Sequence, residues 1–500
     1  TSVLSVGFGG SGGLEAPAMQ AGAAMGSEVA SQTRKHFRRR LLLIGCAAAG
    51  SLAAMFKAPV AAIVFAVEVI MIDLTASSLV PILMASLASL LTAFVFFEGE
   101  DILTVPTLAA FQASQGLNFV APTNGWPTNI ALHGLGGGKE MNLAYAGTYA
   151  AAGVATISID MPLHGARSFD INGDGVYEMS ATAPAFGSLI GKPNAFTNGN
   201  PLVFVNIAST LTVRDNFRQA TLDHLALRLL LQGMAGQLAA TNQPQVFDVS
   251  KISAQGLSLG GIVGTTFSTY ASTGLTDPST GASLGNPYVI NATSLVAPAG
   301  GLAGSFAGSA AFGPQLFANV TASSTFAALL AAANTAGYEE GTAEYEALVQ
   351  AVYAGFIPSF ALAVQTAVDS ADPLNHAGML AATELPVHLI EVVGDGADNL
   401  SDQTLPNSVA NFPLSGTEPL IAAIGLDCVD STMPGSGAVR FSKGHHSSIV
   451  SPSEVPGVTD GMASAATAEM QAQVAGFAKT AGLGQATIAI SNSDVIQSCN

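Results

Sequence analysis

The sequence has few cysteines and few charged residues, and these shortages exclude several classes of protein. Only 3 of the 500 residues are cysteine, which excludes a small domain held together by many disulfides. Lysine and arginine number 16 against 34 aspartate and glutamate residues, so the formal net charge is −18. A chain with this balance repels a phosphate backbone, and we expect no nucleic-acid partner. Its length predicts more than one domain, or one large domain with insertions.

Two of the three cysteines could pair. Cys428 and Cys499 both lie in the acidic part of the chain, whereas Cys46 lies in an apolar stretch near the N-terminus. One disulfide between Cys428 and Cys499 would form in an oxidising compartment only if the fold brings the two together. The sequence leaves that question open.

Charge and hydropathy divide the chain near residue 100. Residues 1–100 hold six basic and six acidic residues, so residues 101–500 carry the whole −18. Residues 79–97, LVPILMASLASLLTAFVFF, form a 19-residue stretch without a charge. At about 1.5 Å per residue, such a helix nearly spans a bilayer core of about 30 Å. We therefore predict an all-α, membrane-type helical fragment over 1–100, followed by a soluble domain over 101–500, and membrane association through the fragment.

The first hundred residues resemble part of a known transporter family. GSGGLEAPAMQAGAAMGS, followed by LLLIGCAAAGSLAAMFKAPVAAIVFAVEV, is similar to the middle of ClC chloride channels and chloride/proton antiporters. The resemblance implies that Glu15, in Gly-Leu-Glu-Ala-Pro, is the gating carboxylate at the start of a helix whose amides face the anion. Other landmarks of that family are missing, including the second half of its inverted repeat, so this fragment is not expected to work as a channel alone.

The pattern after residue 101 predicts an α/β fold. Apolar runs typical of strands occur at 128–132, 154–160, 252–256, 294–297 and 387–393, and helical patterns occur at about 140–152, 214–240, 261–272 and 463–481. Strands that alternate with helices favour a parallel sheet covered on both faces. Residues 301–382 interrupt the alternation with an alanine-rich helical stretch, which predicts a helical cap inserted between two strands.

A serine between two glycines follows one of these strands. KISAQGLSLGG supplies a strand, a sharp turn at Ser258 and the start of a helix, which is the order found in the nucleophile elbow of α/β-hydrolases. A serine hydroxyl needs a base beside it and donors for the developing oxyanion. The upstream stretch IALHGLGGGKE is typical of an oxyanion loop, so we expect the backbone N–H groups of Leu135 and Leu259 to form the oxyanion hole.

The acid and the base should follow the serine in that order. GDGADNLSDQTLPNS offers three candidate acids, of which Asp402 is preferred to Asp398 and then Asp395. The later stretch SKGHHSSIVSP offers two candidate bases, and His446 is preferred to His445. We predict that Asp402 holds the imidazole of His446 and that His446 takes the Ser258 proton.

One acidic loop has part of a calcium-binding pattern, although no cofactor is needed for the predicted chemistry. FDINGDGVYE places Asp170, Asn172 and Asp174 at the spacing of a calcium loop. The twelfth position is Ala181 instead of glutamate, so the EF-hand pattern fails and a polar turn is the alternative.

Several stretches together resemble one family of hydrolases. WPTNIALHGLGGGKE, ISIDMPLHGARS, RDNFRQATLDHLALRLLL, ISAQGLSLGGIVGTTF and DQTLPNS with GHHSSIVSP are similar to bacterial extracellular lipases of the virulence-factor type. The resemblance implies an α/β-hydrolase that cleaves fatty acyl esters of lipids, lysophospholipids among them, outside the cell or at its surface. Two other hypotheses stay open: a chloride channel-related membrane protein with an accessory C-terminal domain, and a non-natural chimera of two unrelated halves.

Overall fold

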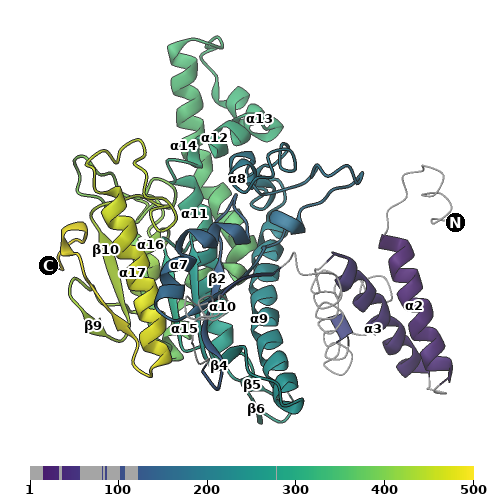
Figure 1. Cartoon of the computed structure of the whole chain (residues 1–500). Coiled ribbons are helices and arrows are strands. Elements are labelled where there is room, and N and C mark those ends of the chain that lie inside the picture. Colours follow the sequence, from purple (N-terminus) through teal and green to yellow (C-terminus); the bar gives the residue numbers. More distant parts are fainter. Residues whose placement is uncertain are drawn as a thin grey trace. The chain divides into compact units, whose positions relative to one another are not determined.

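The computed structural model describes residues 15–32, 37–56, 82, 85–86, 102–106, 122–277 and 279–499. The chain forms two compact units, one of Thr1–Asp101 with Leu275–Leu284 and the other of Ile102–Gly274 with Gly285–Asn500 (Figure 1). The apolar stretch at 79–97, predicted to span a membrane, lies outside the described residues apart from 82, 85 and 86.

The N-terminal unit contains a pair of packed helices, α2 (Glu15–Gln32) and α3 (Phe37–Phe56). Glu15 is the first residue of α2, and its role as a gating carboxylate stays a prediction. The two helices approach closely at Gly22, where an added Cβ would lie 2.5 Å from the carbonyl oxygen of Ala47. Small residues permit such backbone contact between apolar helices.

The larger unit is built on a seven-stranded sheet in the order β1-β3-β2-β4-β7-β8-β10. β1 pairs antiparallel to β3, and the other six strands are parallel. The strands are β1 (Ile102–Val105), β2 (Trp126–Leu132), β3 (Ala155–Ile159), β4 (Phe247–Leu257), β7 (Ala292–Val296), β8 (Val387–Val392) and β10 (Gly437–Phe441). Because all six parallel strands point the same way, the segments that follow them meet at one edge of the sheet.

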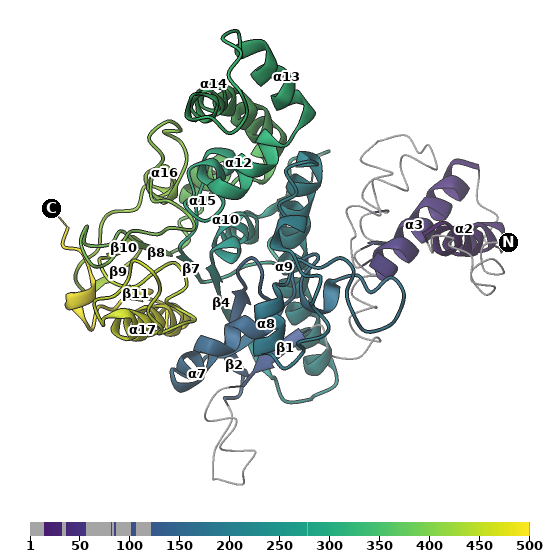
Figure 2. The ribbon, with the colours of Figure 1, turned by 90° about the horizontal axis from the view of Figure 1, so that it is seen from above.

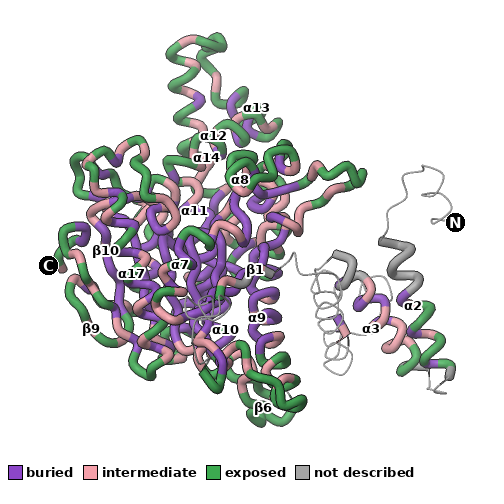
Figure 3. Tube along the Cα trace, in the orientation of Figure 1, coloured by how far each residue is buried: buried purple, intermediate pink, exposed green. Residues whose placement is uncertain are grey.

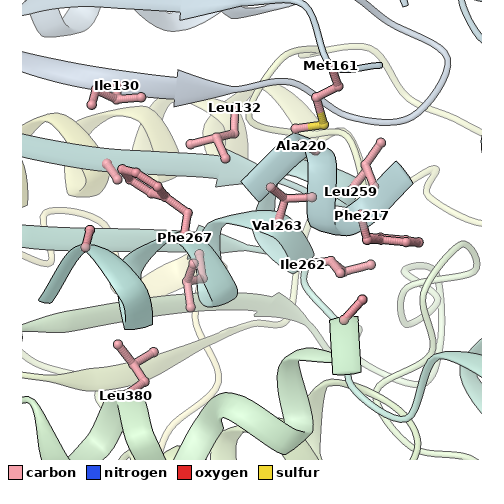
Figure 4. Close-up of a cluster of buried hydrophobic side chains, with 14 of the residues drawn as sticks. Ile130, Leu132, Met161, Phe217, Ala220, Leu259, Ile262, Val263, Phe267 and Leu380 are labelled. Atoms are coloured by element: carbon pink, nitrogen blue, oxygen red, sulfur yellow. The ribbon is translucent and has the colours of Figure 1, made fainter. Parts of the chain in front are cut away.

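Helices cover both faces of this sheet (Figure 2). One face carries α9 (Thr210–Ala240), α10 (Leu259–Ser272), α15 (Pro373–Ala382) and α16 (Thr417–Ile424), and the other carries α7 (Leu143–Ala151) and α17 (Ala463–Gly482). Figure 3 shows the strands buried between these layers. On the α9 and α10 side, Phe217 and Phe267 pack with Ile130, Leu132 and Leu259 (Figure 4). Strands with apolar side chains on both faces are expected when helices cover both sides of a parallel sheet.

The segment between β7 and β8 is helical, as predicted for 301–382, but its last helix belongs to the sheet layers. It forms α11 (Leu302–Ala307), α12 (Gly313–Thr321), α13 (Ser324–Ala333), α14 (Ala343–Val368) and then α15, which packs against α10 and α16. The helices α12, α13 and α14 enclose a small core of their own, made of Leu316, Val320, Phe326, Leu330 and Val349. Within the described residues, Ala343–Ala382 is long and apolar enough to cross a membrane by length and composition alone.

This arrangement is the α/β-hydrolase fold with a helical cap. The evidence is a parallel six-stranded sheet, an antiparallel strand at one edge, helices on both faces and a sharp turn from β4 into α10. The cap is the pair α12 and α13 with the N-terminal part of α14. The fold predicted from the sequence for the larger part of the chain is confirmed.

A disulfide joins Cys428 to Cys499, with their Cα atoms 5.8 Å apart. It holds the C-terminal tail along β10, the last strand of the sheet. In that tail Ile496 forms a bridge with Phe441, and the Gln497 N–H donates to the carbonyl of Arg440 at 2.8 Å. The pairing that the sequence left open is thus present, and the tail covers an edge that would otherwise expose free backbone groups.

Replacing both Cys428 and Cys499 by serine should destabilise the larger unit by about 2–4 kcal/mol, since the bond closes a long loop in the unfolded chain. The two cysteines are separated by 71 positions. Urea unfolding can be followed through Trp126, the single tryptophan of the chain, which begins β2. Cys46→Ser is the matched control, because Cys46 is a free cysteine. Equal unfolding midpoints for the double variant and the control would contradict the prediction.

Candidate active site

Ser258 sits in a strained turn between β4 and α10. Its backbone has φ 57° and ψ −116°, a region that residues with a side chain rarely adopt. The strand pairing holds this conformation, because the Ser258 N–H donates to the carbonyl of Val296 on β7 at 2.8 Å. The Ser258 carbonyl in turn accepts from Ile262 in the first turn of α10. The turn therefore displays the serine side chain at the carboxyl edge of the sheet.

Two glycines make this turn sterically possible. A Cβ at Gly256 would lie 2.0 Å from the carbonyl oxygen of Gly260, and a Cβ at Gly260 would lie 2.1 Å from that of Leu132. Any side chain at either position would collide with backbone. The Gly-x-Ser-x-Gly spacing is thus required by the close approach of α10 to β2 and β4.

Asp402 and His446 are brought together at the same edge. Asp402 follows β8, and its N–H donates to the carbonyl of Val392 at 3.0 Å. One carboxylate oxygen of Asp402 accepts from the N–H groups of Thr404 and Leu405, and the other lies 2.5 Å from Nδ1 of His446. A carboxylate can only accept, so Nδ1 of His446 carries the proton and Nε2 is left as an acceptor.

The alternative acids and base have other partners. His445 places Nε2 2.9 Å from the Ser453 carbonyl and accepts from the Ser447 N–H at Nδ1. Asp395 pairs with Lys443 at 2.7 Å, and this hydrogen bond, with those from backbone N–H groups, lowers the pKa of Asp395 to about 2. Asp398 contributes its backbone carbonyl, which accepts from Thr459. Of the five candidates, the structure joins only Asp402 and His446.

The contact between Ser258 and His446 stays a prediction. The two residues follow β4 and β10, whose carboxyl ends lie at one edge of the sheet. Within the described residues, the hydroxyl of Ser258 forms no hydrogen bond to the His446 imidazole. Catalytic hydrogen bonds are often long without substrate and tighten when it binds.

Asn399 is a positioning residue that the sequence analysis missed. Its amide group is fully buried, donates to the Gly444 carbonyl at 2.8 Å and accepts from the Gly444 N–H at 2.9 Å. This reciprocal pair links the loop that carries Asp402 to the loop that carries His446. Nothing in the sequence distinguishes this asparagine from an ordinary turn residue.

The glycine-rich loop after β2 holds the N–H of Leu135, a predicted oxyanion donor, between amides that have acceptors elsewhere. The neighbouring N–H groups are used: Gly134 donates to the Met141 sulfur, Gly136 to Nε2 of His164, and Gly137 to the Gly134 carbonyl. Within the described residues, the N–H groups of Leu135 and Leu259 donate to no acceptor. Leu259 is the first residue of α10, where an N–H has no partner in its own helix. Both predicted oxyanion donors are therefore free.

Two buried histidines hold the oxyanion loop. His133 accepts from the Met161 N–H at 2.9 Å, and His164 accepts from the Gly136 N–H at 3.3 Å. Nδ1 of each ring faces a backbone carbonyl, so each is a neutral ring that donates at Nδ1 and accepts at Nε2. Burial lowers the pKa of both, and that of His164 lies well below its ordinary value. His164 thereby engages the Gly136 amide, which is not left over as a donor in this loop.

Charged pairs beneath the loop fix it to the segment that follows β3. Both the backbone N–H and the side-chain ammonium of Lys139 donate to the carboxylate of Asp160, each at 2.7 Å. Arg167 donates to the Asp160 carbonyl and pairs with Asp223 of α9. All four side chains are almost fully buried. Removing one member of a buried pair leaves an uncompensated charge, so these pairs make the loop rigid.

A further buried histidine, His388 in β8, gives the fold a dependence on pH. Burial lowers the pKa of His388 to about 4, below the value of about 6.5 expected in an unfolded chain. Between these values the unfolded chain binds a proton that the folded chain does not. Stability is therefore complete above pH 6.5 and falls as the pH decreases toward 4.

The free energy of unfolding should rise less steeply with pH in the variant His388→Gln. Between pH 4.5 and 6 its slope should be smaller by about 1.4 kcal/mol per pH unit, the value for one proton. Urea unfolding followed by Trp126 fluorescence, at several pH values, measures it. Identical slopes in the variant and the unchanged protein would show that His388 binds protons equally in the folded and the unfolded chain.

The acidic loop after β3 could hold a cation. One oxygen atom each from Asp170, Asp174 and Glu178 lie within 4.8 Å of one another. Asp170 also accepts from the N–H groups of Gly173 and Gly175. Glu178 stands at the ninth position of the loop, where the sequence analysis did not look for a ligand. Calcium binding by Asp170, Asn172 and Asp174 stays a prediction.

Comparison with known proteins separates the two parts of the chain. The family model of the voltage-gated chloride channels matches residues 1–132. This match covers 132 of 500 residues and runs beyond the fragment expected at 1–100, through strands β1 and β2 of the sheet. No curated protein matches the chain.

Several solved structures are similar to the chain at low sequence identity. The monoacylglycerol lipase of Paleococcus ferrophilus is 11% identical, with 76% of this chain and 98% of that chain covered and a TM-score of 0.31. Acetyl xylan esterase 1 of Thermoanaerobacterium sp. is 14% identical, with 69% and 74% covered and a TM-score of 0.30. Esterase B of Lactobacillus rhamnosis is 13% identical, with 62% and 73% covered and a TM-score of 0.25. At such TM-scores the fold assignment rests on the strand order and the turn at Ser258, and these similarities add nothing to it.

Proposed function

We propose that the larger unit is a serine hydrolase of carboxylic esters. The observation that carries the proposal is the Asp402–His446 pair at the same sheet edge as the strained turn of Ser258. With Nδ1 directed at Asp402, the neutral ring of His446 offers Nε2, which is the atom that a serine nucleophile needs as its base. The free amides of Leu135 and Leu259 supply donors of the kind that stabilise an oxyanion.

The reaction would proceed in two halves. Ser258 Oγ attacks the ester carbonyl while its proton passes to Nε2 of His446, and the carbonyl oxygen, now negative, accepts from the two free amides. The C–O bond to the alcohol then breaks, His446 returns the proton to the departing alkoxide, and an acyl-serine remains. Water repeats the sequence on this acyl group and releases the carboxylic acid. Asp402 keeps the imidazole in the required tautomer and stabilises its charged form.

A fluorophosphonate probe tests the proposal directly. The probe phosphonylates a serine only where a base has activated it, so the probe should label the full-length protein on the peptide that contains Ser258. Mass spectrometry of the labelled peptide identifies the residue. A label on another serine, or none, would overturn the assignment.

The substrate class and location are also proposals. The stretches similar to virulence-factor lipases favour fatty acyl esters of lipids as substrates, cleaved outside the cell or at its surface. The Cys428–Cys499 disulfide supports an oxidising compartment, because disulfides are rare in the reducing cytosol.

A second function, membrane attachment through residues 1–100, is supported by the chloride-channel family match and by the uncharged stretch at 79–97. A channel-related protein with an accessory hydrolase domain and a non-natural chimera are the alternatives to a membrane-attached hydrolase. When membranes that carry the full chain are extracted with alkaline carbonate, the chain should stay in the membrane pellet. Release of the chain into the supernatant would exclude an integral membrane span.

A further inference from the structure

The larger unit contains an apolar cavity of about 340 Å³. Its walls come from the segment 200–217, from α11 and α12, and from the C-terminal half of α14. Apolar side chains form most of the lining, among them Val205, Phe217, Leu302, Phe306, Ile357 and Phe360. The polar lining residues are Asn200, Asn206, Thr210, Gln315 and Asn319, all uncharged. A pocket without any charged side chain favours an uncharged, apolar ligand.

Two parts of the cavity lining lead toward the proposed oxyanion hole. On one side, Asn200 and Leu202 line the cavity, and Pro201 between them lies close to Gly136 in the oxyanion loop. On the other side, Phe217 and Leu302 line the cavity and belong to the buried cluster that contains Leu259, the residue after Ser258. Figure 4 shows Phe217 and Leu259 in that cluster. These residues make the cavity a candidate for the chain attached to a carbonyl at Ser258.

Buried hydrogen bonds fix the walls relative to each other. The carboxylate of Asp372 accepts from the N–H groups of Gly301 and Leu302 at the start of α11, at 3.0 and 2.6 Å. It also accepts from the Gln365 amide of α14 at 2.8 Å, and the carbonyl oxygen of that amide accepts from the Ala303 N–H at 3.0 Å. Because α11 and α14 are joined in this way, the cavity is part of the folded structure and needs no ligand to form it.

We infer that this cavity binds the acyl chain of the ester and sets its preferred length. The inference rests on the proposed hydrolase function and extends it to a substrate class, esters of a single medium-length, uncharged acyl chain. If one methylene occupies about the volume of one water molecule, about 30 Å³, the cavity holds roughly ten carbons. The cavity therefore predicts that kcat/KM rises with acyl-chain length up to about ten carbons and does not rise further for longer chains.

A series of p-nitrophenyl esters from acetate to myristate, assayed below their micelle concentrations, measures this preference. Each methylene buried in the cavity should raise kcat/KM about fourfold, the factor that corresponds to its transfer free energy. The rise should end near the decanoate ester. A protein that hydrolyses all esters equally well would retain the proposed function and overturn the acyl-chain site. A protein that hydrolyses none of them would overturn the function itself.

Two adjacent positions on α14 offer a matched pair of variants. Ala361 lines the cavity and is 4% exposed, whereas Leu362 does not line it and is 69% exposed. Ala361→Phe should fill part of the cavity, lowering kcat/KM for the decanoate ester at least tenfold while changing that for the acetate ester less than twofold. Leu362→Phe should leave both unchanged. An equal loss on acetate and decanoate in a folded Ala361→Phe protein would contradict the inference.

A cavity-enlarging variant covers the case in which Ala361→Phe does not fold. Phe360→Ala removes a ring from the lining and should shift the longest preferred chain by several carbons, with kcat/KM for laurate and myristate esters rising relative to decanoate. Trp126 fluorescence and the rate on the acetate ester confirm that the fold and the chemistry remain. An unchanged chain-length profile in this variant would overturn the inference.

Discussion

Replacing Ser258 by alanine is expected to lower kcat for p-nitrophenyl octanoate by at least about 10⁴-fold, since loss of a serine nucleophile removes the covalent route entirely. The fold should be preserved, because the strained turn depends on backbone contacts with Val296 and on the glycines at 256 and 260. Initial rates of the purified full-length protein measure the effect. The residual rate should equal what substrate binding and the oxyanion donors achieve alone.

Ser268→Ala is the control for this experiment. Ser268 is a fully buried serine on the same helix, α10, and its hydroxyl donates to that of Thr293 at 2.9 Å. Its loss should cost about 1 kcal/mol of stability, the usual net value of one hydrogen bond, and leave kcat unchanged. If Ser258→Ala retained activity and Ser268→Ala lost it, the nucleophile assignment would be wrong.

The turn at Ser258 could be predicted from the sequence because its requirements are local. A strand followed by glycines at the second position before and after the serine leaves little choice of backbone path, and the structure shows the contacts that demand those glycines. The parallel strands and their helices were also predictable, because strand and helix periodicities differ clearly in those segments.

Other parts of the fold depend on contacts between distant segments. The short strand Ile102–Val105 has no pattern of its own and is a strand because it pairs with β3. The pairing of Cys428 with Cys499 depends on where the tail runs beside β10. The helix α15 looks like the end of the cap in sequence, but its apolar side packs on α10.

The sequence could rank the three candidate acids but could not choose among them, because the choice depends on three-dimensional geometry. Asp395, Asp398 and Asp402 share one loop within eight positions, and each is a reasonable turn residue. What separates them in the structure is the bond from the Asp402 N–H to Val392, which places that carboxylate beside His446. The link between the two loops through Asn399 also depends on contacts between segments that are distant in the sequence.

The variants His446→Ala and Asp402→Asn test this geometry, and each should lower kcat by about 10³- to 10⁴-fold or more with the fold intact. Without the imidazole, nothing takes the Ser258 proton. The Asp402→Asn effect has a different cause. An asparagine amide can donate to Nδ1 of His446, which would move the ring proton to Nε2 and leave the serine without an acceptor. Initial rates with p-nitrophenyl octanoate measure both losses.

The neighbouring candidates supply matched controls for these variants. His445→Ala removes an imidazole one position away that bonds to the Ser453 carbonyl, and Asp395→Asn removes a carboxylate that pairs with Lys443. Asp398→Asn changes a side chain that forms no hydrogen bond within the described residues, since only the backbone carbonyl of Asp398 accepts one. Each should retain kcat within about threefold, since none of these groups touches His446 or Ser258. A loss of 10³-fold or more in His445→Ala with an active His446→Ala would exchange the roles of the two histidines. The Asp402–His446 pair would then be a structural contact, because the base that activates Ser258 would be a residue whose imidazole faces Ser453.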